Sequence, residues 1–222
     1  MKSDEFKSLV TDLGKCDKCL YLNDKSLINF YSSDMALSIP SIWTDWLNHL
    51  DADVMIIGQD WGPYKDMELL YKRYVNGEKW IDLINEEKSL TKKNLFKLLK
   101  MTNKEMDESK IFITNAIMCA RSGTNYRGDN INLKYSTCAC SNYLKRQIDI
   151  VDPKVIVTLG YYPLLALSNI FGFTVESNLT KTIEKNPVIK VDNYIIVPAF
   201  HPAAQISLES QIKQYKRIWD NI

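Results

Sequence analysis

Short apolar runs alternate along this chain with longer segments whose apolar residues recur at helical spacing. Continuous apolar runs that end at a glycine or a polar residue are typical of strands buried on both faces. The predicted strands are 54–57, 111–113, 155–159, 188–191 and 194–197, the last two flanking an Asp-Asn turn. The helical spacing predicts helices at 3–14, 41–50, 66–75, 90–101, 138–150, 163–171 and 205–220, and a polar loop at 121–137.

This alternation of strands and helices predicts the fold class. Successive strands that are joined by helices form a mostly parallel sheet, which helices cover on both faces. The 222 residues are enough for one α/β domain with a sizeable core, and no internal repeat or Pro/Gly/Ser-rich linker divides them. We therefore expect a single α/β domain over residues 1–222.

The composition is that of an ordinary globular protein. Hydrophobic residues make up 45% and the formal net charge is +1, so no overall basic field indicates a nucleic-acid partner. Local clusters of Lys and Arg are interpreted as solvated helix faces. The N-terminus lacks the apolar segment of a signal peptide, and no apolar run reaches the roughly 20 residues of a membrane span. We expect a cytoplasmic monomer without membrane contact.

Polar side chains suited to chemistry follow three of the predicted strands. Gln59 and Asp60 come directly after the first strand, Asn115 closes the second, and His201 follows the last. Loops at the carboxyl ends of parallel strands are where an open α/β sheet places its site. We therefore expect an acid, an amide and an imidazole from distant parts of the chain to meet in one crevice.

Each of these residues also has a structural interpretation. Asp60 alone is more typical of a helix cap than of a catalytic acid. Asn115 offers one acceptor and two donors in a plane, which suits the edge of a pyrimidine, but an Asn also closes loops. His201 is held by Pro202 at the mouth of the last strand, or is a loop histidine with a local partner. The joint occurrence of the three favours a site.

The cysteines form a second candidate site. Cys16 and Cys19 have the two-residue separation that lets two thiolates bind one metal centre, and Cys119, Cys138 and Cys140 lie near later element ends. Thiolate ligation suits zinc or an iron–sulfur cluster, and spacing does not separate the two. The alternative is that these are unrelated thiols, because free cysteine is often a small buried apolar residue.

Four segments in this order resemble the uracil-DNA glycosylase superfamily. Ile57-Gly58-Gln59-Asp60 is similar to its first catalytic motif, and Thr114 to Cys119 resembles the strand that carries its uracil-reading Asn. Val155 to Gly160 is similar to its apolar strand ending in Leu-Gly, and Phe200 to Ala204 resembles its second catalytic motif. The resemblance covers roughly residues 16–206 as short motifs, whose order is more specific than any one of them.

The resemblance implies a fold and a cofactor. The superfamily fold is a three-layer α/β/α arrangement around a central, mostly parallel four-stranded sheet. The four-cysteine branch, which binds a 4Fe–4S cluster, has a layout matched by Cys16, Cys19, Cys119 and Cys140, with Cys138 as the alternative fourth ligand. Zinc remains the alternative to the cluster.

The resemblance also implies roles in hydrolysing the N-glycosidic bond of a uracil flipped out of DNA. Asp60 would stabilise the sugar cation and orient water, and His201 would donate to O2 of the leaving base. Asn115 would read the base, with Gln59 and Tyr64 beside it. Trp61 and Phe96 are further candidates for the aromatic residue that stacks on the base.

The segment after His201-Pro202 would supply the wedge that fills the vacated base stack, with Gln205 and Ile206 as candidates. One departure is that the cluster-bearing branch usually has Gly-Glu-Ala-Pro-Gly at the first motif, where this chain has Gln59 to Pro63. Three alternatives therefore stay open: a member that binds DNA or a damaged base without excising it, a nucleoside or nucleotide hydrolase, and a zinc-stapled domain without a catalytic site.

Overall fold

The computed structural model describes residues 1–19, 27–32, 35, 46–79, 82–83, 90–123 and 133–222. The helices are α1 (Lys2–Gly14), α3 (Tyr64–Val75), α5 (Leu90–Thr102), α6 (Leu133–Val151), α7 (Tyr161–Phe171), α8 (Leu179–Lys185) and α9 (Leu208–Trp219). The strands are β1 (Leu27–Ile28), β2 (Val54–Gly58), β3 (Ile111–Asn115), β4 (Ala120–Arg121), β5 (Val155–Leu159), β6 (Ile189–Val191) and β7 (Tyr194–Ala199). Short 3-10 turns are η2 (Phe30–Ser32), η3 (Trp46–Asn48) and η4 (Glu108–Lys110).

The central sheet has the strand order β3-β2-β5-β7-β6. Strands β3, β2, β5 and β7 run parallel, and β6 pairs antiparallel with β7 at the edge. The predicted mostly parallel sheet is confirmed, with one strand more than the four that the resemblance implied. The extra strand is the first arm of the predicted hairpin around Asp192-Asn193, which adds β6 to the sheet edge.

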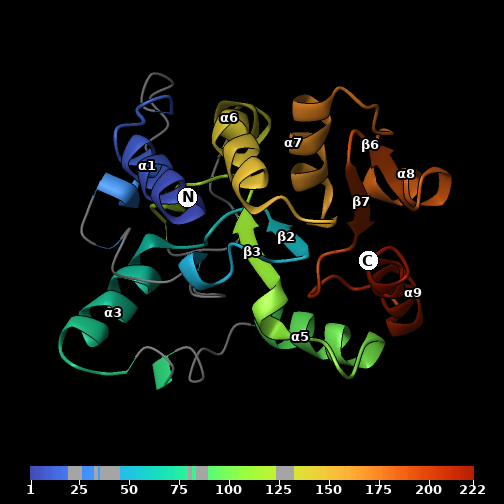
Figure 1. Cartoon of the computed structure of the whole chain (residues 1–222), viewed down its shortest axis with the longest axis horizontal. Coiled ribbons are helices and arrows are strands. Elements are labelled where there is room, and N and C mark those ends of the chain that lie inside the picture. Colours follow the sequence, from blue (N-terminus) through green and yellow to red (C-terminus); the bar gives the residue numbers. More distant parts are fainter. Residues whose placement is uncertain (20–26, 33–34, 36–45, 80–81, 84–89, 124–132) are drawn as a thin grey trace.

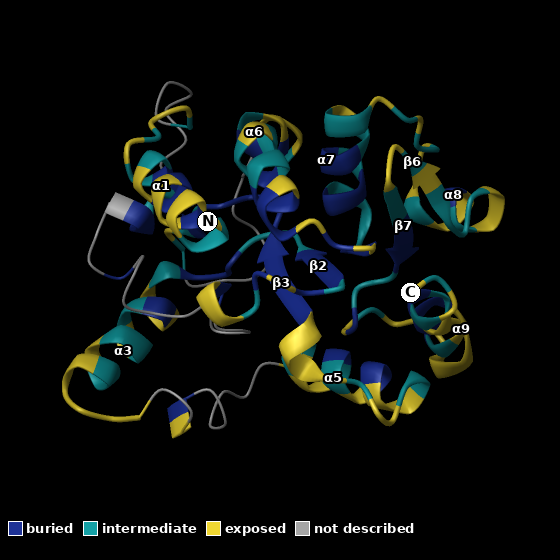
Figure 2. Cartoon of the chain, in the orientation of Figure 1, coloured by how far each residue is buried: buried dark blue, intermediate teal, exposed yellow. Residues whose placement is uncertain are grey.

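Helices cover both faces of this sheet, which confirms the three-layer α/β/α fold (Figure 1). Helices α1, α6 and α7 pack against one face, where Met55, Phe112 and Ile156 point. Helices α5 and α9 pack against the other face, where alternate strand residues such as Ile56 and Val157 point. The inner strands are buried on both sides, as the continuous apolar runs of β2, β3 and β5 predict, and Figure 2 shows β2 and β3 mostly in the colour of buried residues.

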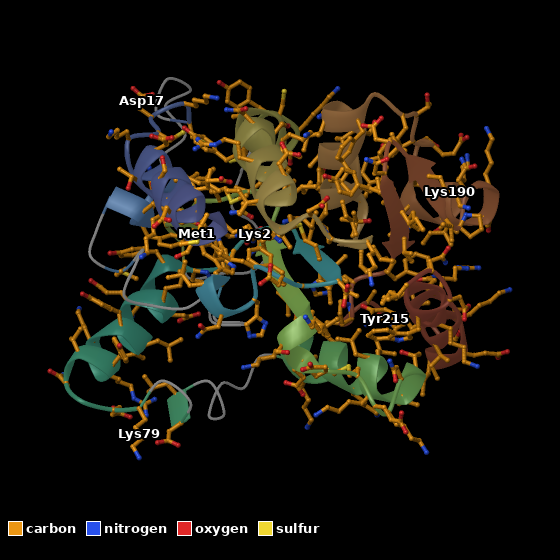
Figure 3. The ribbon with its side chains drawn as sticks, viewed as in Figure 1. Met1, Lys2, Asp17, Lys79, Lys190 and Tyr215 are labelled. Atoms are coloured by element: carbon orange, nitrogen blue, oxygen red, sulfur yellow. The ribbon has the colours of Figure 1, made fainter. Side chains whose placement is uncertain are left out.

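The first helix is tied to the body of the molecule at its N-terminus. The Lys2 ammonium donates to the carbonyls of Leu50 and Val151, at 3.1 and 3.0 Å, and lies 3.0 Å from the Asp51 carboxylate. Figure 3 shows Lys2 next to the body and Asp17 beyond the other end of α1. The helix therefore holds the Cys16 segment at a fixed place beside the sheet.

The structure differs from the predicted elements in three places. Helix α6 begins at Leu133 rather than at residue 138, inside the predicted loop. Helix α8 was not predicted; the Asn178 side chain caps it by accepting from the Lys181 N–H at 3.0 Å. Strands β1 and β4 are only two residues long and form a small separate sheet, so neither has a periodicity to find.

The predicted helix at 41–50 falls largely outside the described residues, and its end forms the 3-10 turn η3. Among the described residues we find no helix with the length and hydrophobicity that crossing a membrane requires.

Candidate active site

Three predicted site residues line one cavity at the carboxyl ends of the parallel strands. Asp60 follows β2, Asn115 ends β3 and His201 follows β7, and all three border a space of about 590 Å³, here called the strand-end cavity. Strand β5, which lies between β2 and β7, contributes Leu159 and Gly160 to its wall. In an open α/β sheet, a crevice forms at the carboxyl ends of neighbouring strands where the strand order reverses, and the site lies at such a place.

Close packing of two strand ends sets the position of Asn115. Gly58 pairs with Asn115 in register, and the backbone N–H of Ala116 donates to the Gly58 carbonyl at 2.8 Å. A Cβ on Gly58 would lie only 2.4 Å from Oδ1 of Asn115, so this close approach requires glycine.

The Asn115 side chain is almost buried, with 5% of its surface exposed, and it lines the strand-end cavity. Below it, the Thr114 hydroxyl donates to Oε1 of Gln147 on α6 at 2.7 Å, and Nε2 of Gln147 approaches Sδ of Met118 at 3.7 Å. The backbone of Asn115 is thus held by the sheet, and its amide lines the cavity with Oδ1 close to Gly58.

Asp60 is tied down by four hydrogen bonds. Nε and Nη2 of Arg121 donate to its two carboxylate oxygens at 3.0 and 2.6 Å. The Gln59 amide donates to Oδ2 at 2.8 Å and the Gly62 backbone N–H donates to Oδ1 at 2.9 Å. Only 5% of the Asp60 side chain is exposed.

Asp60 does not cap the following helix. The N-cap residue of α3 is Pro63, which has no side-chain cap bond, and the carboxylate instead closes a turn onto Gly62. The interpretation of Asp60 as a helix cap is therefore not what the structure shows. With two donors on each oxygen, the carboxylate has no acceptor position open for a water in this arrangement.

His201 presents one ring nitrogen to its own loop. The Ala203 backbone N–H donates to Nδ1 at 3.2 Å, so the neutral ring carries its proton on Nε2. Burial lowers the pKa of His201 below its usual value, and the nearby charge of Asp60 partly opposes this shift. The second histidine, His49, lies elsewhere, with Nδ1 at 2.8 Å from the Ile111 carbonyl.

The candidates for base stacking separate in the structure. Trp61 lines the strand-end cavity and is 5% exposed, whereas Tyr64 and Phe96 pack against the two cores and are not part of its lining. Tyr64 is the first residue of α3 and packs, partly buried, against the core that includes Met55 and Phe112. The structure therefore does not bring Tyr64 together with Gln59 and Asn115 as the sequence predicts.

The predicted wedge residues, Gln205 and Ile206, lie outside the lining of the strand-end cavity. Gln205 and Ile206 are exposed in the loop between β7 and α9, two and three residues beyond Ala203 of the cavity wall. The Ile206 side chain is 38% exposed, and its backbone N–H donates to the Ala204 carbonyl at 2.9 Å. An exposed apolar side chain thus follows the cavity wall by three residues, in a turn closed by a backbone hydrogen bond.

Four of the five cysteines border a second, smaller space. Cys16, Cys19, Cys119 and Cys140 line a void of about 30 Å³, here called the cysteine cavity, together with Tyr31 and others. Cys138 is exposed and is not part of this lining. Residues 138 and 140 are two positions apart on α6 and so point to nearly opposite sides of the helix.

The environment of these thiols suits a positively charged group. The hydrogen bond with Cys19, burial and the charges of the other cysteines all raise the pKa of Cys119 far above its usual value. Burial raises the pKa of Cys140 to about 12, although a backbone N–H of Met118 and the charge of Lys18 oppose this. Four thiolates at one place repel each other, so they require a cation between them.

The four cysteines fit a metal-containing group by the chemistry of their side chains, but their geometry is not that of a complete coordination shell. Within the described part of the chain, no three His, Cys, Asp or Glu side chains stand in a geometry that could hold a single metal ion. The Tyr31 hydroxyl, which lines the same cavity, is buried without a hydrogen-bond partner. An orphaned buried hydroxyl beside four thiols is what a sulfur-rich group placed there would satisfy.

Two contributors to the strand-end cavity were missed by the sequence analysis. Arg121 lines it and holds Asp60, and its signal in the sequence was only a lone basic residue two positions after Cys119. Gly160 was noted only as a strand stop, but it has a positive φ of 104° and forms part of the wall between the Asp60 and His201 strands.

Comparison with known proteins agrees with this arrangement. The family model described as the uracil DNA glycosylase superfamily matches residues 44–222. A protein of Sulfurisphaera tokodaii, named type-4 uracil-DNA glycosylase, is 36% identical over 115 residues, which cover 50% of this chain and 50% of that relative. A protein of Saccharolobus solfataricus with the same name is 29% identical over 157 residues, which cover 70% of this chain and 62% of the relative.

The matched segments thus span between half and less than two thirds of the length of these two relatives. The family model covers most of this chain, including both catalytic motifs, the Asn strand and the apolar strand that the sequence analysis singled out. The chain belongs to the uracil DNA glycosylase superfamily.

Proposed function

We propose that this chain hydrolyses the N-glycosidic bond of uracil, or of a related deaminated base, in DNA. The observation that carries the proposal is that Asp60, Asn115 and His201 border one cavity at the strand ends. The names of the two relatives, both type-4 uracil-DNA glycosylases, support the same reaction and substrate. Because the bond is inaccessible in a stacked duplex, the nucleotide must be flipped out to enter.

Asn115 is proposed to read the base. Its amide would donate to O4 of uracil and accept from N3–H, and cytosine presents the opposite pattern at these two positions. Cytosine would therefore leave buried polar groups unpaired, at a cost of about 1–3 kcal/mol for each. The position of this nearly buried side chain in the lining of the strand-end cavity supports the role.

His201 is proposed to assist the leaving group. A neutral imidazole whose Nδ1 accepts from Ala203 keeps its proton on Nε2, where it can be donated toward O2 of the departing base. A preorganised donor of this kind contributes about 2.7–4 kcal/mol to the stability of a transition state. The lowered pKa of His201 keeps the ring neutral near pH 7.

Asp60 is proposed to stabilise the positive charge that develops on the sugar as the bond breaks. Gln59 lies beside it and supports its carboxylate. The exposed Ile206, together with Gln205, is proposed to fill the space that the flipped base leaves in the stack.

The cysteine cavity is proposed to hold a 4Fe–4S cluster bound by Cys16, Cys19, Cys119 and Cys140. A single zinc ion needs four thiolates converging at about 2.3 Å from one point, whereas a cluster takes one thiolate on each iron. The four thiols border one void of about 30 Å³, which supports a shared bound group, and the resemblance to the four-cysteine branch favours the cluster over zinc. Its role would be structural, linking the end of α1 to the loop after β3 and to α6.

The direct test is to incubate the protein with single- and double-stranded DNA that contains uracil and to measure abasic sites. Asp60→Asn and His201→Ala should each lower the rate by about 100-fold or more. His49→Gln is the matched control, because His49 lies outside the strand-end cavity. Unchanged rates in the first two variants would contradict the proposed roles.

A second candidate is a member that binds a flipped base without excising it. The observation that favours it is the complete hydrogen bonding of Asp60, whose charge is already compensated by Arg121. A gel shift with uracil-containing DNA but no abasic product would support this candidate over the first.

A further inference from the structure

Arg121 meets Asp60 in the fork-to-fork geometry that gives the most directional of protein ion pairs. Nε donates to one carboxylate oxygen at 3.0 Å and Nη2 donates to the other at 2.6 Å. The side chains are only 13% and 5% exposed, so solvent screens the pair little. A pair of this kind fixes the plane of the carboxylate as well as its position.

The backbone of Arg121 is fastened to the same loop that carries its partner. Its N–H donates to the Gly62 carbonyl at 2.8 Å, and it forms a bridge with Pro63. On its other side, β4 pairs with β1, with Arg121 opposite Leu27. The guanidinium therefore starts from a backbone that is held on two sides, and it has little freedom to leave Asp60.

The other donors to Asp60 come from neighbouring residues and depend on the same geometry. Gln59 and Gly62 each supply one hydrogen bond, at 2.8 and 2.9 Å. Together with Arg121 they fill the two acceptor positions of each oxygen. The orientation of the carboxylate toward the strand-end cavity is therefore set by the ion pair and completed by the loop.

We infer that Arg121 is a positioning residue of the reaction, acting on the bond-breaking step through Asp60 and not by holding DNA. The inference rests on the proposed function, because it assigns Asp60 a part in catalysis. Removal of Arg121 leaves a nearly buried carboxylate without its main partner, and such a group reorients or draws in water. The loss then falls on the rate of the chemical step rather than on the affinity for substrate.

The test is a double-mutant cycle on the full chain with uracil-containing single-stranded DNA, measured under single-turnover conditions. Arg121→Gln should lower the maximal rate by about 100-fold while KM changes by less than about threefold. In an Asp60→Asn background the same Arg121→Gln change should lower the rate by less than about twofold, because residues that act as a unit are not additive. Arg121→Lys should be intermediate, since an ammonium cannot bind both oxygens in the same plane.

Chemical rescue separates positioning from folding. Guanidinium chloride at sub-denaturing concentration should restore part of the rate of Arg121→Ala, and sodium chloride at equal ionic strength should not. Arg146→Gln is the matched control, because it removes a 2.8 Å Arg–Asp pair between α6 and α1, away from the strand-end cavity. Melting temperatures of all variants are measured alongside.

Three results would overturn the inference. Additive losses in the cycle, or a rise in KM with a weaker salt dependence of DNA binding, would show that Arg121 acts on its own, as a phosphate contact does. Loss of rate that follows the melting temperature and is not rescued by guanidinium would make it a structural residue. If the wild-type protein forms no abasic sites, the proposed function falls together with this inference, whereas an active wild-type protein with an additive cycle removes the inference alone.

Discussion

The strand-end cavity is framed by parallel strands whose backbones the sheet holds in register, whereas the cysteine cavity is framed by the end of α1, the loop after β3 and one turn of α6. In the first, polar groups such as Asp60 already have protein partners. In the second, burial and the neighbouring cysteines raise the pKa of Cys119 and Cys140, and for Cys140 the charge of Lys18 opposes this only in part. One region is complete as folded, and the proposed cluster would complete the other.

The largest effect is expected from a substitution in the cysteine cavity. Cys119→Ser removes a thiol from the loop that also carries Asn115, so the bound group and the stability that it adds should both be lost. We expect loss of iron and of visible absorbance, and a decrease in the free energy of unfolding of about 4 kcal/mol or more. Iron and zinc analysis with an absorbance spectrum measures the first, and thermal unfolding the second.

Cys138→Ser is the matched control for this experiment, because Cys138 is exposed and lies outside the cysteine cavity. It should keep metal content and stability unchanged. Metal loss in Cys138→Ser with retention in Cys140→Ser would reverse the proposed fourth ligand.

The next largest effect is expected when the strand-end cavity is disturbed without replacing any of its proposed functional residues. Gly58→Ala places a methyl group 2.4 Å from Oδ1 of Asn115, so the amide must move. We expect a loss of about 10- to 100-fold in kcat/KM for uracil-containing DNA, since small displacements of a positioned group cost this much. Metal content should stay at the wild-type level, because the two cavities are separate.

Gly77→Ala serves as the comparison for that variant. Gly77 has a positive φ, which Gly58 does not, and it is not part of the lining of the strand-end cavity. Its substitution should reduce stability slightly and leave activity unchanged. Equal activity losses in the two glycine variants would mean that strain, and not the displacement of Asn115, is responsible.

A smaller effect tests the link between the two regions. Thr114→Val removes the hydroxyl that donates to Gln147 of α6, and it leaves a buried amide oxygen unpaired. The free energy of unfolding should fall by about 1–3 kcal/mol. Thr114→Ser, which keeps the hydroxyl, should lose less, and chemical denaturation of the three proteins measures the difference.

The smallest effect is on the protonation of His201. Burial lowers its pKa, so the folded protein takes up this proton at a lower pH than the unfolded chain, whose histidine titrates at about 6.5. As pH falls from about 6.5 toward the folded pKa, the unfolded state binds more protons, and the contribution of His201 to stability is lost. An activity that needs the neutral ring should likewise persist below pH 6.5 and decline with a midpoint beneath it.

NMR titration of the two histidines, assigned with His201→Gln, measures this pKa directly. Asp60→Asn removes a charge that raises it and should move the His201 midpoint further down. A His201 midpoint above 6.5, or no response to Asp60→Asn, would contradict the description of the site.

The parts predicted from sequence are those encoded by neighbouring residues. The strands 54–57 and 111–113 were found because a run of apolar residues is a local pattern, and their ends then located Asp60 and Asn115. Arg121 could not be found in this way, since its partner Asp60 is 61 positions away and only the folded chain brings them together.

The fourth cysteine shows where more could have been read. Cys140, Leu144 and Gln147 recur at helical spacing and are all buried, while Cys138 lies off this face. The helical spacing of the apolar residues in α6 therefore already indicated that Cys140, and not Cys138, lies on the buried face. Tyr64 is the opposite case, because the direction of its ring depends on where α3 begins, which no local signal fixed.

Gly160 leaves the middle of the strand-end cavity open, and its backbone angles of φ 104° and ψ −176° belong to a region that only glycine adopts without strain. A larger residue here would be penalised by the main chain before its side chain reached a ligand. The backbone conformation of Gly160 therefore disfavours any residue whose side chain would narrow the cavity at this point. Such a mutation would also weaken the junction between β5 and α7.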